Sequence, residues 1–285
     1  MIWIFLLVAL AVLVLGSYTD FRTREVPDWV NYGLIFTGVG LHGILSAVSW
    51  NWLPILSSGI GLGIGMGVAF AMYYLGQWGG GDAKMLMGLG ALIGFDFSYD
   101  SFLLSFLINA FLLGALYGLG YGVFLAVKNK KKFRETYRKL RSFVPAILRR
   151  GIVICWIAAV LLAIVFLFWN NFLLIYLGAI IVMLLVFYHL YLFAKSIEKC
   201  CMLKYVSPDK LTEGDWIVHD VYVKGKRVCG PKDLGILKKQ INILKRARIK
   251  KILVKDGIPF VPSFLIAFVM TMFAGNVLFY LFSIV

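Results

Sequence analysis

Residues 53–95 read LPILSSGIGLGIGMGVAFAMYYLGQWGGGDAKMLMGLGALIGF, and this stretch predicts the fold class of the chain. Residues 53–78 contain no Asp, Glu, Lys or Arg, and a helix needs about 20 apolar residues to cross a membrane. Residues 85–95 are also apolar but shorter, which indicates a half-buried helix or a short span packed against its neighbours. The sequence GGGDAK between them puts a carboxylate at the junction of two membrane segments.

Other parts of the chain share this character. The chain is 61% hydrophobic and only 15% charged, whereas a soluble domain usually has about 25% charged residues. Residues 1–19 lack the basic start of a cleavable signal peptide, so we expect them to remain as a span. Further uncharged stretches of spanning length are residues 1–19, 29–50, 101–127, 151–169, 172–194 and 257–285. We therefore predict an all-α polytopic membrane helix bundle with about eight apolar segments.

The positive charge of the chain is concentrated in a few places. The formal net charge is +15, from 29 Lys and Arg against 14 Asp and Glu. Ten basic residues lie in residues 128–150 and sixteen in residues 195–255, and Arg22, Arg24 and Lys84 complete the set. We count residues 85–95 as a span, because the N-terminus is then outside and every basic residue is cytoplasmic. The charge is thus a topology signal, and we expect contact with membrane lipid and no nucleic-acid partner.

Two polar segments separate the later spans. We predict that residues 128–150 form a basic amphipathic segment on the inner leaflet, with a solvated loop as the alternative. Residues 195–257, called the insert below, alternate polar and apolar side chains and predict a small cytoplasmic α+β unit. We expect its elements to be a hairpin over residues 216–228 that turns near Lys224 and Gly225, a helix over residues 233–249 and a strand over residues 251–254.

Small residues in residues 53–78 follow a helical spacing. Gly59, Gly63 and Gly67 repeat every four residues, and Gly61 and Gly65 form a second row. Such rows let helix backbones approach closely in lipid. We therefore interpret them as helix-packing positions and not as a ligand site.

Several kinds of chemistry lack the residues they need. The three His residues form no HExxH motif, so a zinc metalloprotease is not indicated. The four Cys residues have no CxxC spacing, so we expect no metal site and no cofactor. The chain also has no GxSxG nucleophile elbow and no Walker A loop.

Two aspartates remain at the predicted cytoplasmic edge of the bundle. Asp20 directly follows the first apolar segment, and Asp82 precedes the short fourth one. Gly79, Gly80 and Gly81 before Asp82 permit the close approach of another chain to its carboxylate. The alternative is a tight turn in which Asp82 caps the following helix.

Two carboxylates at one depth of a bundle can share a proton. One then acts as a base on water while the other donates to a carbonyl oxygen, as in an aspartyl protease. Glu25 and Asp28 lie in the same loop as Asp20, but Asp20 is preferred because it abuts the apolar span. Lys84 is a candidate support for a neighbouring carboxylate.

The flanking sequences of both aspartates resemble a known family. GGGD resembles the GxGD motif of intramembrane aspartyl proteases, and YTDFRTREVPDWVNY followed by GGGDAKMLMGLGAL resembles the type IV prepilin peptidase family. The later DGIPFVPSFLIA is similar to archaeal members, the prepilin and preflagellin peptidases. The resemblance implies that Asp20 and Asp82 are catalytic and that the family core has six spans, so that residues 151–194 form a surplus hairpin.

The resemblance also implies an activity. It is that of an aspartic endopeptidase in the cell membrane, which removes the short basic leader (a class III signal peptide) from prepilins or preflagellins at the cytoplasmic face. Bacterial relatives also N-methylate the product and carry paired CxxC motifs, which this chain lacks, so we expect cleavage without methyl transfer. A non-enzymatic transporter or channel that uses both aspartates as cation or proton ligands is the alternative.

A presenilin-like protease is a third reading, and the position of the first aspartate directly after the first span speaks against it.

The predicted domains are a catalytic transmembrane core (residues 1–127), a basic cytoplasmic loop (128–150), a transmembrane hairpin (151–194), the cytoplasmic insert (195–257) and a C-terminal transmembrane helix (258–285).

Overall fold

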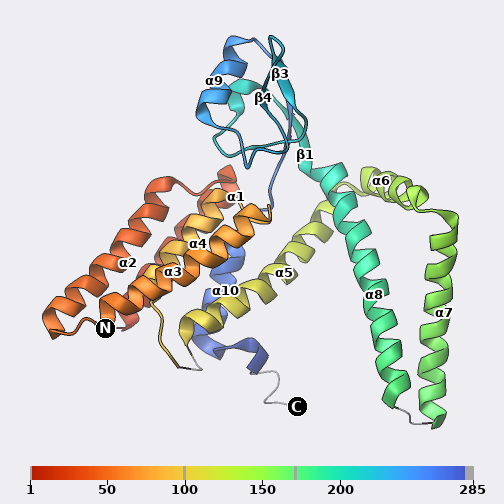
Figure 1. The fold of residues 1–285 in the computed structure, drawn as a ribbon, viewed down its shortest axis with the longest axis horizontal. Helices are drawn as coiled ribbons and strands as arrows, with labels where there is room; N and C mark the ends of the chain where they lie inside the picture. Colours follow the sequence, from red (N-terminus) through yellow and green to blue (C-terminus); the bar gives the residue numbers. More distant parts are fainter. Residues whose placement is uncertain (1, 99–100, 170–171, 280–285) are drawn as a thin grey trace. The chain divides into compact units, whose positions relative to one another are not determined.

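The chain is largely helical (Figure 1). A computed structural model describes residues 2–98, 101–169 and 172–279. The helices are α1 (Ile2–Thr23), α2 (Asp28–Ser49), α3 (Leu53–Tyr74), α4 (Gly80–Ile93), α5 (Phe102–Lys128), α6 (Lys130–Phe143), α7 (Ala146–Trp169), α8 (Phe172–Ile197), α9 (Lys238–Arg246) and α10 (Val261–Ala274). The strands are β1 (Leu203–Val206), β2 (Trp216–Ile217), β3 (Val221–Val223), β4 (Lys226–Cys229) and β5 (Ile252–Lys255).

Six of the described helices are long and apolar enough to cross a membrane, namely α1, α2, α3, α5, α7 and α8. The two remaining predicted apolar segments are also helical in the described residues, as α4 and α10, with 14 residues each. A helix of that length rises only about 21 Å, whereas the hydrocarbon core is about 30 Å thick. These observations confirm a polytopic helical membrane protein with a small α+β insert.

The chain divides into two compact units, which are residues 1–121 with 206–285, and residues 122–205. In the first unit α4 packs along α2 and α3, and α10 packs on α1. Most side chains of α4 are buried, including Met85, Leu86 and Leu89, which are fully inaccessible. Short α4 is thus an inner helix of the first unit, surrounded by longer ones.

The contact between α3 and α4 is a glycine contact. A Cβ added to Gly61 would overlap the carbonyl oxygen of Gly90, and one added to Gly65 would lie 2.9 Å from the carbonyl oxygen of Leu86. The packing prediction is therefore confirmed for Gly61 and Gly65.

The same prediction is wrong for the other glycine row of α3. An added Cβ would meet no heavy atom within 4 Å, apart from the local helix backbone, at Gly59, Gly63 and Gly67. The two rows are offset by two residues, which turns a helix by about 200°, so they occupy opposite faces. Only one row can face α4.

Helix α10 is tied to α5 by a buried amide. Asn109 on α5 donates from Nδ2 to Thr271 Oγ1 at 2.9 Å and to the Gly275 carbonyl oxygen at 2.7 Å. Its Oδ1 accepts the backbone N–H of Val277 at 3.0 Å. A buried amide is costly unless its groups are paired, and here both ends of the amide have partners. Asn109 therefore fixes the end of α10 against α5.

In the second unit α7 packs along α8, and Phe133 of α6 contacts Phe193 of α8 with ring centroids 5.7 Å apart. Helix α6 begins at Lys130 and has no buried residue, as expected for a basic surface helix. Its location on the inner leaflet stays a prediction.

The insert contains the predicted hairpin in a shorter form. Strands β3 and β4 are antiparallel, and Lys224 and Gly225 between them have φ of 49° and 79°, typical of a two-residue hairpin turn. The prediction that the hairpin begins at Trp216 is wrong, because Trp216 pairs with Lys255 of β5 instead. Strand β5 itself is confirmed at the predicted place.

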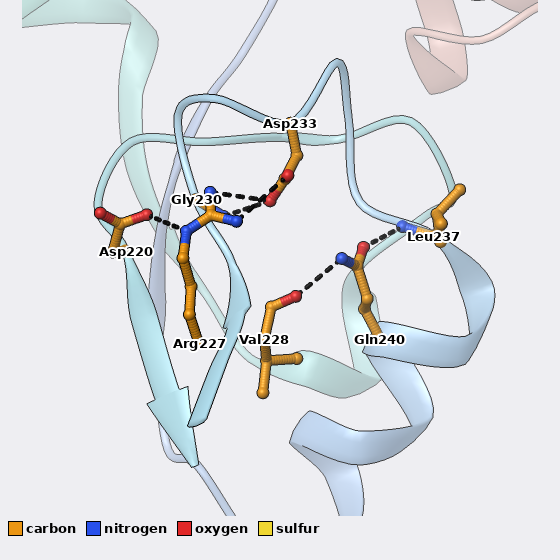
Figure 2. Close-up of polar contacts among 7 residues, drawn as sticks. All are labelled: Asp220, Arg227, Val228, Gly230, Asp233, Leu237 and Gln240. Carbon is orange, nitrogen blue, oxygen red and sulfur yellow. Dashed lines mark hydrogen bonds and ion pairs between the residues drawn. The ribbon is translucent and has the colours of Figure 1, made fainter. Parts of the chain in front are cut away.

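Helix α9 begins later than the sequence pattern predicts, because a salt-bridged loop comes first (Figure 2). Arg227 Nε lies 2.6 Å from Asp220 Oδ1, and Arg227 Nη2 lies 3.1 Å from Asp233 Oδ2. The same Asp233 oxygen accepts the Gly230 N–H at 2.8 Å. Asp233 binds Arg227 and the Gly230 N–H, and the residues that follow it form a loop that ends where α9 begins.

The start of α9 is set by one side chain. Gln240 Oε1 accepts the backbone N–H of Leu237 at 2.7 Å, which satisfies a donor that helix geometry leaves free. Its Nε2 donates to the Val228 carbonyl oxygen on β4 at 2.7 Å (Figure 2). Gln240 thus joins the helix start to the hairpin.

Candidate active site

Asp20 lies in the last turn of α1 and is 5% exposed. Its Oδ2 accepts the backbone N–H of Val261, the first residue of α10, at 3.0 Å. The first N–H groups of a helix have no partner within it, and the helix dipole favours a negative charge at this end. The start of α10 therefore holds the Asp20 carboxylate in a fixed position.

The sequence around Val261 explains why the helix offers this donor. Pro262 occupies the first turn of α10, where proline is well tolerated because the missing N–H would be free anyway. The Val261 N–H, in the same turn, is therefore free to donate to a carboxylate.

Asp82 lies in the first turn of α4, where its Oδ2 accepts the backbone N–H of Gly79 at 3.0 Å. The capping arrangement that the sequence offered as an alternative is therefore present. It engages one oxygen, and in the described part of the chain Oδ1 accepts no hydrogen bond. Asp82 is partly exposed, and Oδ1 can bind a proton or a substrate atom.

Packing brings the two acids to one place. Gly16 lies one turn before Asp20, and a Cβ added to it would be 2.7 Å from Met85 Cε and 3.3 Å from Val261 Cγ1. Met85 lies one turn after Asp82 on α4. The faces of α1 and α4 that carry the aspartates therefore meet. The negative charge of Asp20 acts on Asp82, as expected of two neighbouring carboxylates.

The three glycines before Asp82 have different surroundings. A Cβ on Gly81 would lie 3.4 Å from the backbone nitrogen of Val26, in the α1–α2 loop. A Cβ on Gly80 would meet only Tyr73, at 3.9 Å. The α1–α2 loop thus already approaches Gly81, while Gly80 has room beside it. Close approach of a substrate at these glycines stays a prediction.

An aromatic group supports the loop that leads to the GGGD motif. Trp78 is 4% exposed, and its ring stacks on Phe111 of α5 at 5.8 Å. Its ring centroid also lies 5.4 Å from that of Phe260 and 5.2 Å from that of Phe264, around the start of α10. Trp78 therefore links the Asp82 loop to the helix that holds Asp20. The sequence prediction missed it, although a Trp directly before GGGD was a visible signal.

The insert also reaches this loop within the first unit. Tyr73 donates its hydroxyl to the carbonyl oxygen of Leu234 at 2.8 Å. Gly76 has φ of 68°, and an added Cβ there would lie 2.8 Å from the Trp216 ring. The end of α3 and the loop that follows it thus both lie against the insert.

The other predicted charged residues form a separate pair. Lys84 Nζ lies 2.6 Å from Asp28 Oδ1 and 5.2 Å from the centroid of the Tyr32 ring. The Asp28 side chain is 66% exposed, so it is a poor match for a buried catalytic acid. The structure thus brings Lys84 to Asp28. In the described residues, no group of three or more His, Cys, Asp or Glu is arranged to hold a metal ion.

Part of the chain matches the model of a known family. Residues 7–119 match the family model of the type IV leader peptidase family, and this range contains Asp20 and Asp82. The resemblance seen in the sequence is thereby confirmed for this part of the chain.

The curated relatives are archaeal preflagellin peptidases. The protein from Methanocaldococcus jannaschii is 38% identical over 81 residues, which are 28% of this chain and 34% of the relative. The proteins from Methanococcus voltae and Methanococcus maripaludis are 37% and 38% identical over 81 residues, with 28% of this chain and 34% and 35% of the relatives covered. The chain thus spans about a third of the length of the curated relatives it matches.

Proposed function

We propose that this protein is a membrane-embedded aspartic endopeptidase that removes a short leader peptide from prepilins or preflagellins. The observation that supports the proposal is that Asp20 and Asp82 lie on the facing sides of α1 and α4, inside the range that matches leader peptidases. The names of the curated relatives support preflagellins as the substrate class.

The surroundings of the two acids suggest different roles. Both acids accept a backbone N–H at a helix start, and Asp20 also lies beside the positive charge of Arg24, so we assign it the proton from the attacking water. Asp82 holds a proton on its free Oδ1 and donates it to the carbonyl oxygen of the scissile bond. The water oxygen forms a bond to the carbonyl carbon.

The second step restores both acids. The tetrahedral intermediate returns its hydroxyl proton to Asp82 as the C–N bond breaks, and Asp20 gives its proton to the leaving amine. The two groups exchange roles around one shared proton, so their titration belongs to the pair.

The basic residues support an orientation. Arg22, Arg24 and Lys84 lie at the same ends of their helices as Asp20 and Asp82. By the positive-inside rule this end is cytoplasmic, where a basic leader would remain while its apolar helix enters the bundle from the side. The proposal includes cleavage without methyl transfer and without a metal ion.

The function is tested with purified protein and a panel of prepilin and preflagellin precursors. We expect Asp20→Asn and Asp82→Asn each to lower the cleavage rate by about 10²- to 10⁴-fold or more, because each removes a proton-transfer group. Both variants should accumulate in membranes. Asp28→Asn is the matched control, since Asp28 is a nearby acid at the start of α2 that pairs with Lys84, and this variant should cleave normally.

Full activity of either dyad variant would overturn the assignment, and so would loss of cleavage in a strong chelator. Absence of cleavage together with an ion flux in liposomes that Asp20→Asn removes would favour the transporter alternative.

A further inference from the structure

Arg24 is the first residue beyond α1 and has an unusual backbone. Its φ is 62°, in the left-handed region that glycine adopts easily and arginine does not. Its N–H donates to the Asp20 carbonyl oxygen at 2.9 Å, so this turn is part of the same chain reversal that presents Asp20. The left-handed residue ends α1 and turns the chain toward α2. The side chain of Arg24 explains what the conformation achieves.

The Arg24 side chain turns toward α5. Its Nη2 donates to the Tyr121 hydroxyl at 2.7 Å, and its guanidinium carbon lies 5.6 Å from the centroid of that ring. Tyr117, one turn earlier on α5, stacks with Tyr121 at 6.1 Å and an interplanar angle of 28°. Arg24 and the two tyrosines therefore form one cluster.

This cluster lies beside Asp20. The positive charge of Arg24 acts on Asp20, and the charge of Asp20 acts on Tyr117. Two of its polar groups are buried and have no hydrogen-bond partner in the described residues, namely Arg24 Nη1 and the Tyr117 hydroxyl. A buried polar group without a partner costs about 1–3 kcal/mol. These two donors beside a candidate catalytic acid would gain a partner from an acceptor that arrives with the substrate.

We propose that Arg24 Nη1 and the Tyr117 hydroxyl bind a backbone carbonyl oxygen of the substrate, next to the peptide bond that Asp20 and Asp82 cleave. This inference rests on the proposed function. A carbonyl oxygen has two lone pairs and accepts from both donors at once. A peptide backbone offers such an oxygen at every residue, so this subsite holds the strand in register without reading its side chains. Arg24 and Tyr117 are substrate-positioning residues, since neither reaches the proton-transfer steps.

The sharpest test is Tyr117→Phe. It removes a hydroxyl that has no partner within the described protein, so a purely structural role predicts unchanged or slightly higher stability. The substrate role predicts about a tenfold rise in KM with little change in kcat, because the bond is made in both ground and transition states. Arg24→Lys keeps the positive charge but loses the second N–H of the fork, and should raise KM by about 10- to 100-fold.

The chain offers a matched control on the exposed face of α1. Arg22 donates from Nη1 to the Tyr18 hydroxyl at 2.9 Å, which is also an Arg–Tyr pair, but an exposed one. Arg22→Lys and Tyr18→Phe should leave KM unchanged.

Kinetics are measured with the purified full-length variants and a precursor that the unaltered protein cleaves, and Tm is measured for each variant. An unchanged KM in both Tyr117→Phe and Arg24→Lys, or a fall in kcat alone, would overturn the subsite. If Asp20→Asn still fails to cleave in the same assay, the proposed function stands while the subsite falls.

Discussion

The two aspartates are held by bonds of very different reach. The Asp82 cap comes from Gly79, three residues earlier, whereas the Asp20 bond comes from Val261, 241 residues later. Local sequence thus positions one acid, and tertiary packing positions the other. A change that shifts the start of α10 would therefore alter the support of Asp20.

At the scale of single residues, Lys84 gives a clear prediction. Because its ammonium group pairs with exposed Asp28 and not with the aspartate pair, Lys84→Met should leave kcat/KM unchanged. A surface ion pair contributes about 1 kcal/mol at most, so the free energy of unfolding should fall by less than that. Denaturant unfolding and cleavage kinetics check both values. A large loss of kcat would instead link Lys84 to the chemistry.

The candidate acids could be chosen from the sequence because Asp20 and Asp82 each adjoin an apolar segment. Their supports could not. Val261 reaches Asp20 only through the folded bundle, and no local pattern encodes a contact across 241 residues. Trp78 was visible beside the motif, but its burial against Phe260 depends on where α10 begins. Whether the pair is catalytic stays a prediction.

At the scale of helices, the glycine rows of α3 allow a paired test. Gly61→Ala places a methyl group against the Gly90 carbonyl oxygen and should lower the free energy of unfolding by about 1–3 kcal/mol. Gly63→Ala points to open space and should cause no loss, because alanine favours a helix over glycine. Thermal unfolding in detergent separates the two variants. Equal Tm values would contradict the α3–α4 contact.

The sequence could predict that glycines of α3 pack, but not which ones do. Both rows have the same spacing, and the choice depends on the approach of α4, which spacing does not encode. The insert shows the same limit. The turn at Lys224 and Gly225 follows from local preferences, whereas the partner of Trp216 lies on β5, far along the chain.

At the scale of the whole molecule, composition predicted a membrane bundle because uncharged stretches of spanning length leave few other folds. The insert differs, since it has a hydrophobic core of its own that includes Ile217, Cys229 and Leu244. We therefore expect the insert to unfold and refold as one cooperative unit.

Cys229 can report on that unit. It is fully buried, and burial raises the pKa of its thiol, so at pH 8 it should react slowly with a maleimide while the insert is folded. Arg227→Ala removes the salt bridges to Asp220 and Asp233 and should speed labelling severalfold. Lys226→Ala is the control and should not.

The assay uses a variant in which Cys155, Cys200 and Cys201 are replaced by Ser, so that labelling reports Cys229 alone. Labelling should rise with pH as the thiolate fraction increases. Rapid labelling of the folded protein would contradict the burial, and equal rates for the two variants would contradict the role of Arg227.

The bond between Asp20 and Val261 also bears on the timing of synthesis. Ribosomes add about 5–20 residues per second, so both carboxylates are in place many seconds before residue 261 is made. Until α10 inserts, Asp20 lacks the N–H that holds it, and Trp78 lacks its contacts with Phe260 and Phe264. A chain without α10 therefore carries both acids, but Asp20 lacks its bond to Val261. The enzyme we propose would therefore hold Asp20 in its final position only after α10 has been made.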